Sequence, residues 1–86
     1  PGERPQVADT PGFWVQLGAF RVREGAAGLQ QRVLRQADGV PAVVLVEEAG
    51  LFRVQAGPYA TREGAQAAAV ALQRQTGIAG VVVERP

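Results

Sequence analysis

Residues 15–26 read Val-Gln-Leu-Gly-Ala-Phe-Arg-Val-Arg-Glu-Gly-Ala, and residues 54–65 read Val-Gln-Ala-Gly-Pro-Tyr-Ala-Thr-Arg-Glu-Gly-Ala. Seven of these twelve positions are identical at a constant offset of 39 residues, and an aromatic residue, Phe20 or Tyr59, occupies the same place in both copies. Each copy passes from an alternating segment through a turn into a helical segment, and a valine-rich run closes it. This internal repeat predicts a β-α-β-β-α-β order.

The first strand of each copy alternates in polarity, which separates a buried face from an outward face. In the first copy the buried set is expected to be Phe13, Val15 and Leu17, and the outward set Trp14, Gln16 and Gly18. In the second copy the corresponding sets are Phe52, Val54 and Ala56, and Leu51, Arg53 and Gln55.

Two helices are predicted, over residues 24–37 and 63–76, because small and apolar residues recur there with helical spacing. Thr61 is a suitable N-cap for the second helix. Gly39 and Gly77 follow the two segments and are expected to end them.

Valine-rich strands are expected at residues 43–46 and 81–83, with a hairpin turn at residues 47–50 joining the two copies. The fold class is therefore α+β: a split βαβ, ferredoxin-like (RNP-like) domain with a four-stranded antiparallel sheet and both helices on one face. The Pro- and Gly-containing residues 1–12 are expected to be a linker, and residues 13–86 the domain.

Composition excludes several classes of protein. The chain has 86 residues, no Cys, no His and a formal net charge of +1, so neither a transition-metal site nor a nucleophile–His pair is expected, and no cofactor. All nine cations are arginine and there is no Met, which indicates a piece of a longer protein. No apolar run reaches the length of a membrane span, so membrane contact by this domain is not expected.

By the usual strand order of this fold the first and third strands are central, so Trp14, Gln16, Arg53 and Gln55 are expected to lie together on the open face of the sheet. Trp14 then offers an apolar platform for sugar rings, or alternatively packs against the linker at its strand end. The amides of Gln16 and Gln55 suit sugar hydroxyl and acetamide groups. Arg53 suits a carboxylate, or alternatively pairs with a nearby Glu. Tyr59 is expected to pack at its turn and to reach the same groove.

Three functions compete on this scaffold. The carboxylates fall at helix starts, in a turn and at the terminus, so a glycosidase pair is not expected and the domain is predicted not to be an enzyme. An open sheet with an aromatic on its first strand resembles an RNA-recognition motif, but the absence of Lys and the low charge count against nucleic acid. The valine strands also allow a protein-interaction or dimerisation face.

Four stretches carry a resemblance to a known family: residues 13–20, residues 50–59, and the Arg-Glu-x-Ala starts of the two helices, the second preceded by Thr61. They resemble the SPOR (sporulation-related repeat) domain. The third strand and the Val-Val-Val-Glu-Arg ending most resemble the C-terminal domain of the rare lipoprotein A family.

The resemblance implies a monomeric, non-catalytic module that binds septal peptidoglycan, with a preference for denuded glycan strands, whose stem peptides have been removed. It implies a parent protein in the periplasm or cell envelope at the septal ring, anchored in the outer membrane and either a septal lytic transglycosylase or another lipoprotein. Gln16 matches the family glutamine implicated in glycan contact. Ala19 stands where the family often has Ser.

Overall fold

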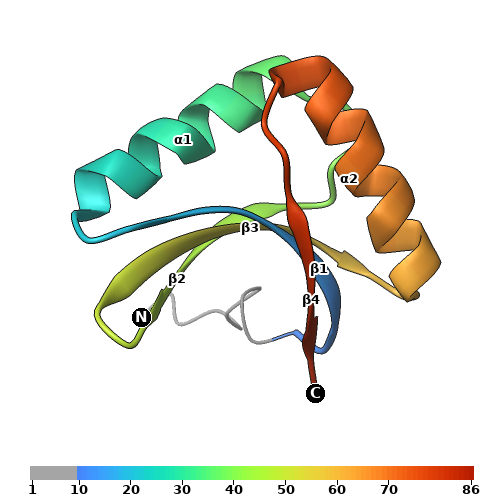
Figure 1. Cartoon of the computed structure of the whole chain (residues 1–86), viewed down its shortest axis with the longest axis horizontal. Coiled ribbons are helices and arrows are strands. Elements are labelled where there is room, and N and C mark those ends of the chain that lie inside the picture. The colour runs from blue at the N-terminus through green and yellow to red at the C-terminus, as the bar shows by residue number, and fades with distance from the viewer. Residues whose placement is uncertain (1–9) are drawn as a thin grey trace, which may run out of the picture.

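The computed structural model describes residues 10–86 and contains the six predicted elements in the predicted order (Figure 1). They are β1 (Gly12–Phe20), α1 (Arg23–Gln36), β2 (Val43–Glu48), β3 (Leu51–Tyr59), α2 (Arg62–Thr76) and β4 (Val81–Arg85). Most of the predicted linker over residues 1–12 lies outside the described residues. Neither helix in residues 10–86 is long and apolar enough to cross a bilayer.

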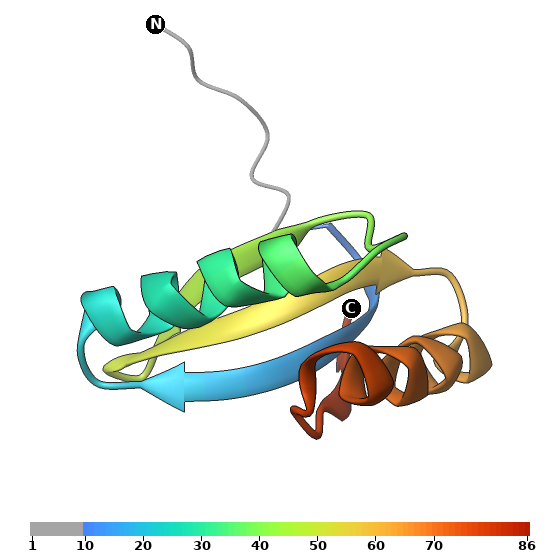
Figure 2. The ribbon, with the colours of Figure 1, turned by 90° about the horizontal axis from the view of Figure 1, so that it is seen from above.

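The four strands form one antiparallel sheet in the order β2-β3-β1-β4, so the first and third strands are central, as predicted. Both helices lie on the same face of this sheet (Figure 1), with α1 over the β2 half and α2 over the β4 half (Figure 2). The predicted α+β class and two-layer arrangement are confirmed. The other face of the sheet, called the open face below, carries no helix of the described chain.

The core fills the space between the sheet and the helices, because each layer has one apolar side to bury. Its buried members are Val15, Leu17, Ala26, Val33, Val43, Val54, Ala56, Ala65 and Leu72. Phe13 and Phe52 are half-buried against this cluster. The buried faces predicted for the two central strands are therefore confirmed.

A bulge in β1 changes the outward set. Gln16 lies opposite Gln55 in β3, but Gly18 lies opposite Val54, so Leu17 is an extra residue on the β1 side. After the bulge the alternation is reversed: Gly18 faces Leu29 of α1, and a Cβ at Gly18 would lie 2.9 Å from Leu29 Cδ2. The prediction that Gly18 faces outward was wrong for this reason. Ala19 takes the outward place, opposite Arg53.

The helix ends follow local capping chemistry, with one correction. Thr61 caps α2 as predicted, since its hydroxyl accepts a 2.9 Å hydrogen bond from the Gly64 N–H. Gly77 ends α2 in the left-handed conformation with φ of 77°. Helix α1 instead ends at Gln36 with an extended Ala37 cap, so Gly39 belongs to the following loop and does not stop the helix.

The β2–β3 hairpin turns on two residues, Ala49 and Gly50, with φ of 53° and 79°. Positive φ at both central residues is the pattern of a type I′ turn, which suits the right-handed twist of the strands and favours Asn-Gly or Gly-Gly. Glycine adopts this conformation freely, whereas the Cβ of Ala49 makes it unfavourable. The turn holds Glu48, the last residue of β2, next to the open face.

We expect Val15→Asp to unfold the domain. Val15 is fully buried on a central strand, and an unpaired buried carboxylate costs several kcal/mol, comparable with the ~5–15 kcal/mol that holds a small domain together. The matched control is Ala19→Asp on the same strand: Ala19 is exposed and lies opposite Arg53, so a change within about 0.5 kcal/mol is expected. Thermal melts of the two variants test the register, and equal destabilisation by both would contradict it.

We expect Ala49→Asn to stabilise the domain by about 0.5–1 kcal/mol, because Asn tolerates the left-handed conformation that Ala49 adopts. For a domain of this size the melting temperature then rises by roughly 2–8 °C. Ala49→Val serves as the opposite control and should lower it, since a β-branched residue is least suited to positive φ. A melting temperature unchanged in both variants would contradict the strained turn.

Candidate functional site

Three of the five predicted site residues, Gln16, Arg53 and Gln55, come together on the open face. They line a groove of about 380 Å³ across the central strands, called the central groove below. Its lining residues are Gln16, Glu48, Arg53, Gln55, Val83, Glu84, Arg85 and Pro86.

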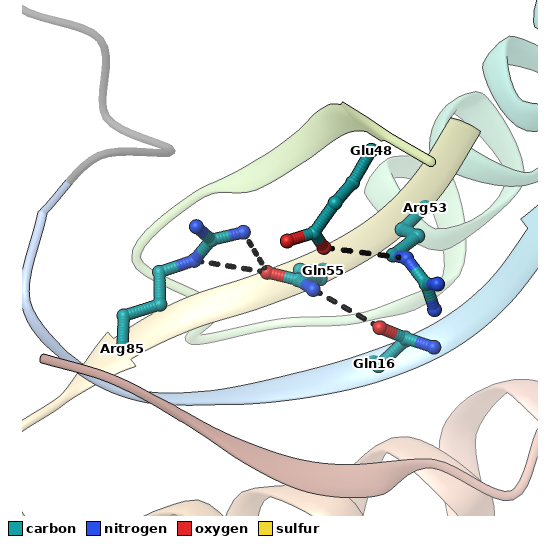
Figure 3. Close-up of polar contacts among 5 residues, drawn as sticks. All are labelled: Gln16, Glu48, Arg53, Gln55 and Arg85. Carbon is teal, nitrogen blue, oxygen red and sulfur yellow. Dashed lines mark hydrogen bonds and ion pairs between the residues drawn. The ribbon is translucent and has the colours of Figure 1, made fainter. Parts of the chain in front are cut away.

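A chain of hydrogen bonds runs across the central groove from β4 to β1 (Figure 3). Arg85 donates from Nε and Nη2 to Gln55 Oε1, at 3.2 and 2.6 Å. Gln55 Nε2 then donates to Gln16 Oε1 at 3.0 Å. Gln55 is only 3% exposed, so these bonds satisfy an amide that is otherwise buried.

Arg85 fixes the direction of this chain. A guanidinium only donates, so the oxygen of Gln55 must face Arg85 and its nitrogen must face Gln16. Gln16 must in turn present its oxygen to Gln55 and its own NH₂ outward. Both amide oxygens are thus used within the protein. Among the described residues no hydrogen bond engages Gln16 Nε2, which leaves it to donate to a ligand.

Arg53 supplies further donors at the β3 side of the groove. Its nearest anionic partner is Glu48, with Arg53 Nε 3.5 Å from Glu48 Oε1. Within the described chain Arg53 Nε is buried and makes no hydrogen bond; its 3.5 Å distance to Glu48 Oε1 is longer than the ~2.7–3.2 Å of an ordinary N–H···O bond. Arg53 therefore has a nearby counter-charge and unused hydrogen-bonding capacity.

Trp14 is not the exposed platform considered above. It lies outside the core cluster under the helices, yet it is 0% exposed. Its indole N–H donates to the Thr10 carbonyl at 3.1 Å, and the Arg85 guanidinium lies 5.7 Å from the ring centroid. Trp14 instead follows the alternative considered above: it packs at its strand end against the segment that leads into β1, at Thr10. The expectation that the ring is open to a sugar was wrong.

Tyr59 lies apart from the other four predicted residues. It packs against the core cluster and lines a second hollow of about 280 Å³, beside α2 and the loop after α1. Burial raises the pKa of its phenol above the ordinary value of 10.0. The expectation that Tyr59 reaches the central groove was wrong, because at the end of β3 the chain turns toward α2 on the helix side.

The comparisons with known proteins agree with this architecture. The family model of the SPOR domain matches residues 9–84. The chain belongs to the SPOR domain family. Its fold is also that of the peptidoglycan-binding domain of the B. subtilis cell wall lytic enzyme CwlC, whose solution structure superposes with a TM-score of 0.69 at 24% identity, over 93% of this chain and 96% of that one. A search of curated proteins found no match.

Two groove residues of this SPOR domain, Arg85 and Glu48, were not predicted as site residues. Arg85 is on the edge strand β4, where alternation from Val81 and Val83 places it on the open face. Glu48 lies on the open face because it is two residues beyond Val46, which is opposite Arg53. Both assignments follow from period-two alternation once the strand order is known, so the signal was present in the sequence.

The carboxylates of the residues that line the groove do not form a catalytic pair. Glu48 is on the open face, whereas Glu84 lies opposite Phe13 and its side chain is on the helix side of the sheet. A general acid for glycoside hydrolysis is usually made by burying a carboxyl group. Glu48 and Glu84 expose 66% and 59% of their side chains, and each lies beside an arginine, Arg53 or Arg62. Within residues 10–86 there is also no cluster of three or more His, Cys, Asp or Glu that could hold a metal ion.

We expect Gly57→Ala to destabilise the domain by about 1–3 kcal/mol. A Cβ at Gly57 would lie 2.9 and 3.0 Å from Trp14 Cε3 and Cδ2, so the buried indole would have to shift. The matched control is Gly28→Ala in α1, because the added Cβ meets nothing within 4 Å. This substitution should stabilise the helix by about 1 kcal/mol. Chemical denaturation followed by Trp14 fluorescence gives both values, and equal effects would contradict the packing.

Proposed function

We propose that this SPOR domain binds the glycan strands of peptidoglycan, prefers strands without stem peptides, and does not cleave them. Membership of the SPOR family and the fold shared with the peptidoglycan-binding domain of CwlC support peptidoglycan binding. The observation that carries the proposal is the row of hydrogen-bond donors in the central groove, at Gln16, Arg53 and Arg85. We further propose that the domain directs a cell-envelope parent, such as a septal lytic transglycosylase or a lipoprotein, to the division septum.

The groove and the glycan are chemically matched. Sugar hydroxyl and acetamide groups accept hydrogen bonds through oxygen, and the groove presents outward donors because its own amide oxygens are occupied. Muramic acid gains a free lactyl carboxylate when its stem peptide is removed, and guanidinium groups bind carboxylates by charge-assisted hydrogen bonds. Recognition here depends on amides and cations rather than on stacking, since Trp14 is buried.

The two rival functions have less support. Single-stranded RNA recognition on an open sheet requires exposed aromatic side chains for base stacking, but Trp14 is buried and Phe13, Phe20 and Phe52 pack toward the core. A dimerisation face requires a continuous apolar patch. The middle of this open face is polar, and Val81, the most exposed of its valines, lies on the edge strand.

We expect the domain to co-sediment with peptidoglycan sacculi, more strongly after amidase treatment, and to release no soluble muropeptides. Gln16→Ala and Arg85→Ala should weaken binding roughly three- to tenfold, since each removes a hydrogen bond to ligand or the group that orients one. The matched controls are Gln31→Ala and Arg35→Ala, which remove the same side-chain types from exposed positions on α1. Wild-type binding by the groove variants, with thermal melts showing them folded, would contradict the site.

Salt distinguishes glycan from nucleic acid in the same assay. The association constant for binding through several phosphates falls as a power of the salt concentration, and the exponent grows with the number of phosphate contacts. A glycan with few carboxylates should bind with little change between low and moderate salt. NMR shift mapping with denuded glycan oligomers should show changes at Gln16, Arg53, Gln55 and Arg85. Shifts confined to α1 and α2 would contradict binding at the open face.

A further inference from the structure

Glu48 lies where a bound anion would be expected. It extends from the end of β2 toward Arg53, and both side chains line the central groove with Gln16 and Gln55 (Figure 3). Arg53 is held against the sheet, with 26% of its side chain exposed, while Glu48 is 66% exposed. The cation is therefore anchored, and its carboxylate partner is the more accessible of the two.

The contact between them is incomplete. Arg53 Nε is 3.5 Å from Glu48 Oε1 and makes no hydrogen bond within the described residues. A well-formed pair between Arg and a carboxylate has donor–acceptor distances of about 2.7–2.9 Å and often two parallel bonds. Glu48 supplies counter-charge to Arg53 without satisfying its hydrogen-bonding geometry, so another carboxylate can bind better.

The remaining charges of the groove leave Arg53 as the cation whose counter-ion can be exchanged. Arg85 is engaged by Gln55 Oε1 and lies over the Trp14 ring. Glu84 also borders the groove, but it lies opposite Phe13 and its carboxylate is on the helix side of the sheet, with Arg62 Nη2 of α2 at 3.8 Å. Glu48 is thus the carboxylate that stands directly between Arg53 and an incoming anionic ligand.

We propose that Glu48 is an intramolecular competitor for Arg53: it lowers the affinity of the groove for carboxylate-bearing ligands, which must displace it, and it keeps neutral sugar groups away from Arg53. This inference rests on the proposed function. A ligand carboxylate displaces Glu48 from Arg53 and replaces one negative charge with another in better geometry. A neutral sugar group at the same place interacts with Arg53 more weakly than the Glu48 carboxylate does. It therefore leaves the Arg53–Glu48 pair intact and makes no hydrogen bond to Arg53.

The test compares two forms of one denuded glycan oligomer, with its lactyl carboxylates free or reduced to alcohols. The native domain should bind the carboxylate form more tightly. Glu48→Gln should tighten binding of the carboxylate form by roughly two- to fivefold, the range expected for an exposed ion pair. It should tighten the reduced form by less, because a neutral alcohol oxygen accepts a weaker hydrogen bond from the freed Arg53. Arg53→Gln should abolish the difference between the two forms. Calorimetry or NMR titration measures all of these affinities.

Glu47→Gln is the matched control, because Glu47 precedes Glu48 on β2, carries the same charge and points to the other face of the sheet. It should leave both affinities unchanged, and melts should show every variant folded. An equal gain from Glu47→Gln would mean a general charge effect and would overturn the inference. Loss of binding to both forms in Glu48→Gln would also overturn it, since Glu48 would then itself contact sugar.

The inference and the proposed function fail differently. Equal binding of the two glycan forms by the native domain would overturn the role of Glu48 and leave glycan binding in place. Binding of neither form would overturn both.

Discussion

The hydrogen bond from Gln55 to Gln16 lies at the centre of the sheet, and the open face is organised around it. A buried amide must find partners for its oxygen and its nitrogen. Gln55, on β3, finds them on two other strands: Gln16 on neighbouring β1, and Arg85 on β4, beyond β1. One side chain therefore ties three strands together, and it requires the edge strand to be in register. The groups that form the candidate site are also structural groups.

The internal repeat accounts for the symmetry of the scaffold, and a position at which the two copies differ accounts for the asymmetry of the site. Arg23 of the first copy lies over the ring of Phe52 in the second copy. The equivalent Arg62 of the second copy lies over Phe13, the equivalent of Phe52 in the first copy. Each copy therefore contributes an arginine that packs on an aromatic ring of the other. Gln16 and Gln55 are likewise equivalent. Trp14, however, is equivalent to Arg53. The buried indole of Trp14 fills one side of the central amide pair, and the partly exposed guanidinium of Arg53 lies on the other side. The two ends of the groove are therefore chemically different.

The sequence was sufficient for the fold because its signals were local and repeated. Alternation, helical spacing and the repeat together predicted the element order, and the usual strand order of the split βαβ fold then predicted which strands are central. The predictions that were wrong depend on contacts between distant residues, which the periodicity of a sequence does not reveal. Leu17 forms a bulge that reverses the alternation of β1. Trp14 is buried because Gly57 lets the indole lie on the β3 backbone and because Thr10 turns back to accept its N–H. Tyr59 leaves the open face because β3 ends there and the chain turns toward α2.

Arg85 decides the chemistry of the groove through two of its five N–H donors, at Nε and Nη2, which bond to Gln55 inside the protein. A glutamine amide is equally able to donate or accept, and two adjacent glutamines with no further partner can take either orientation. Arg85 removes this freedom by demanding the oxygen of Gln55, and the constraint passes through Gln55 to Gln16. The outward group of Gln16 is then a donor in every molecule. A face built from two neutral amides thus becomes selective for acceptors, and the exchangeable anion Glu48 lies beside Arg53, whose Nε makes no hydrogen bond within the described residues.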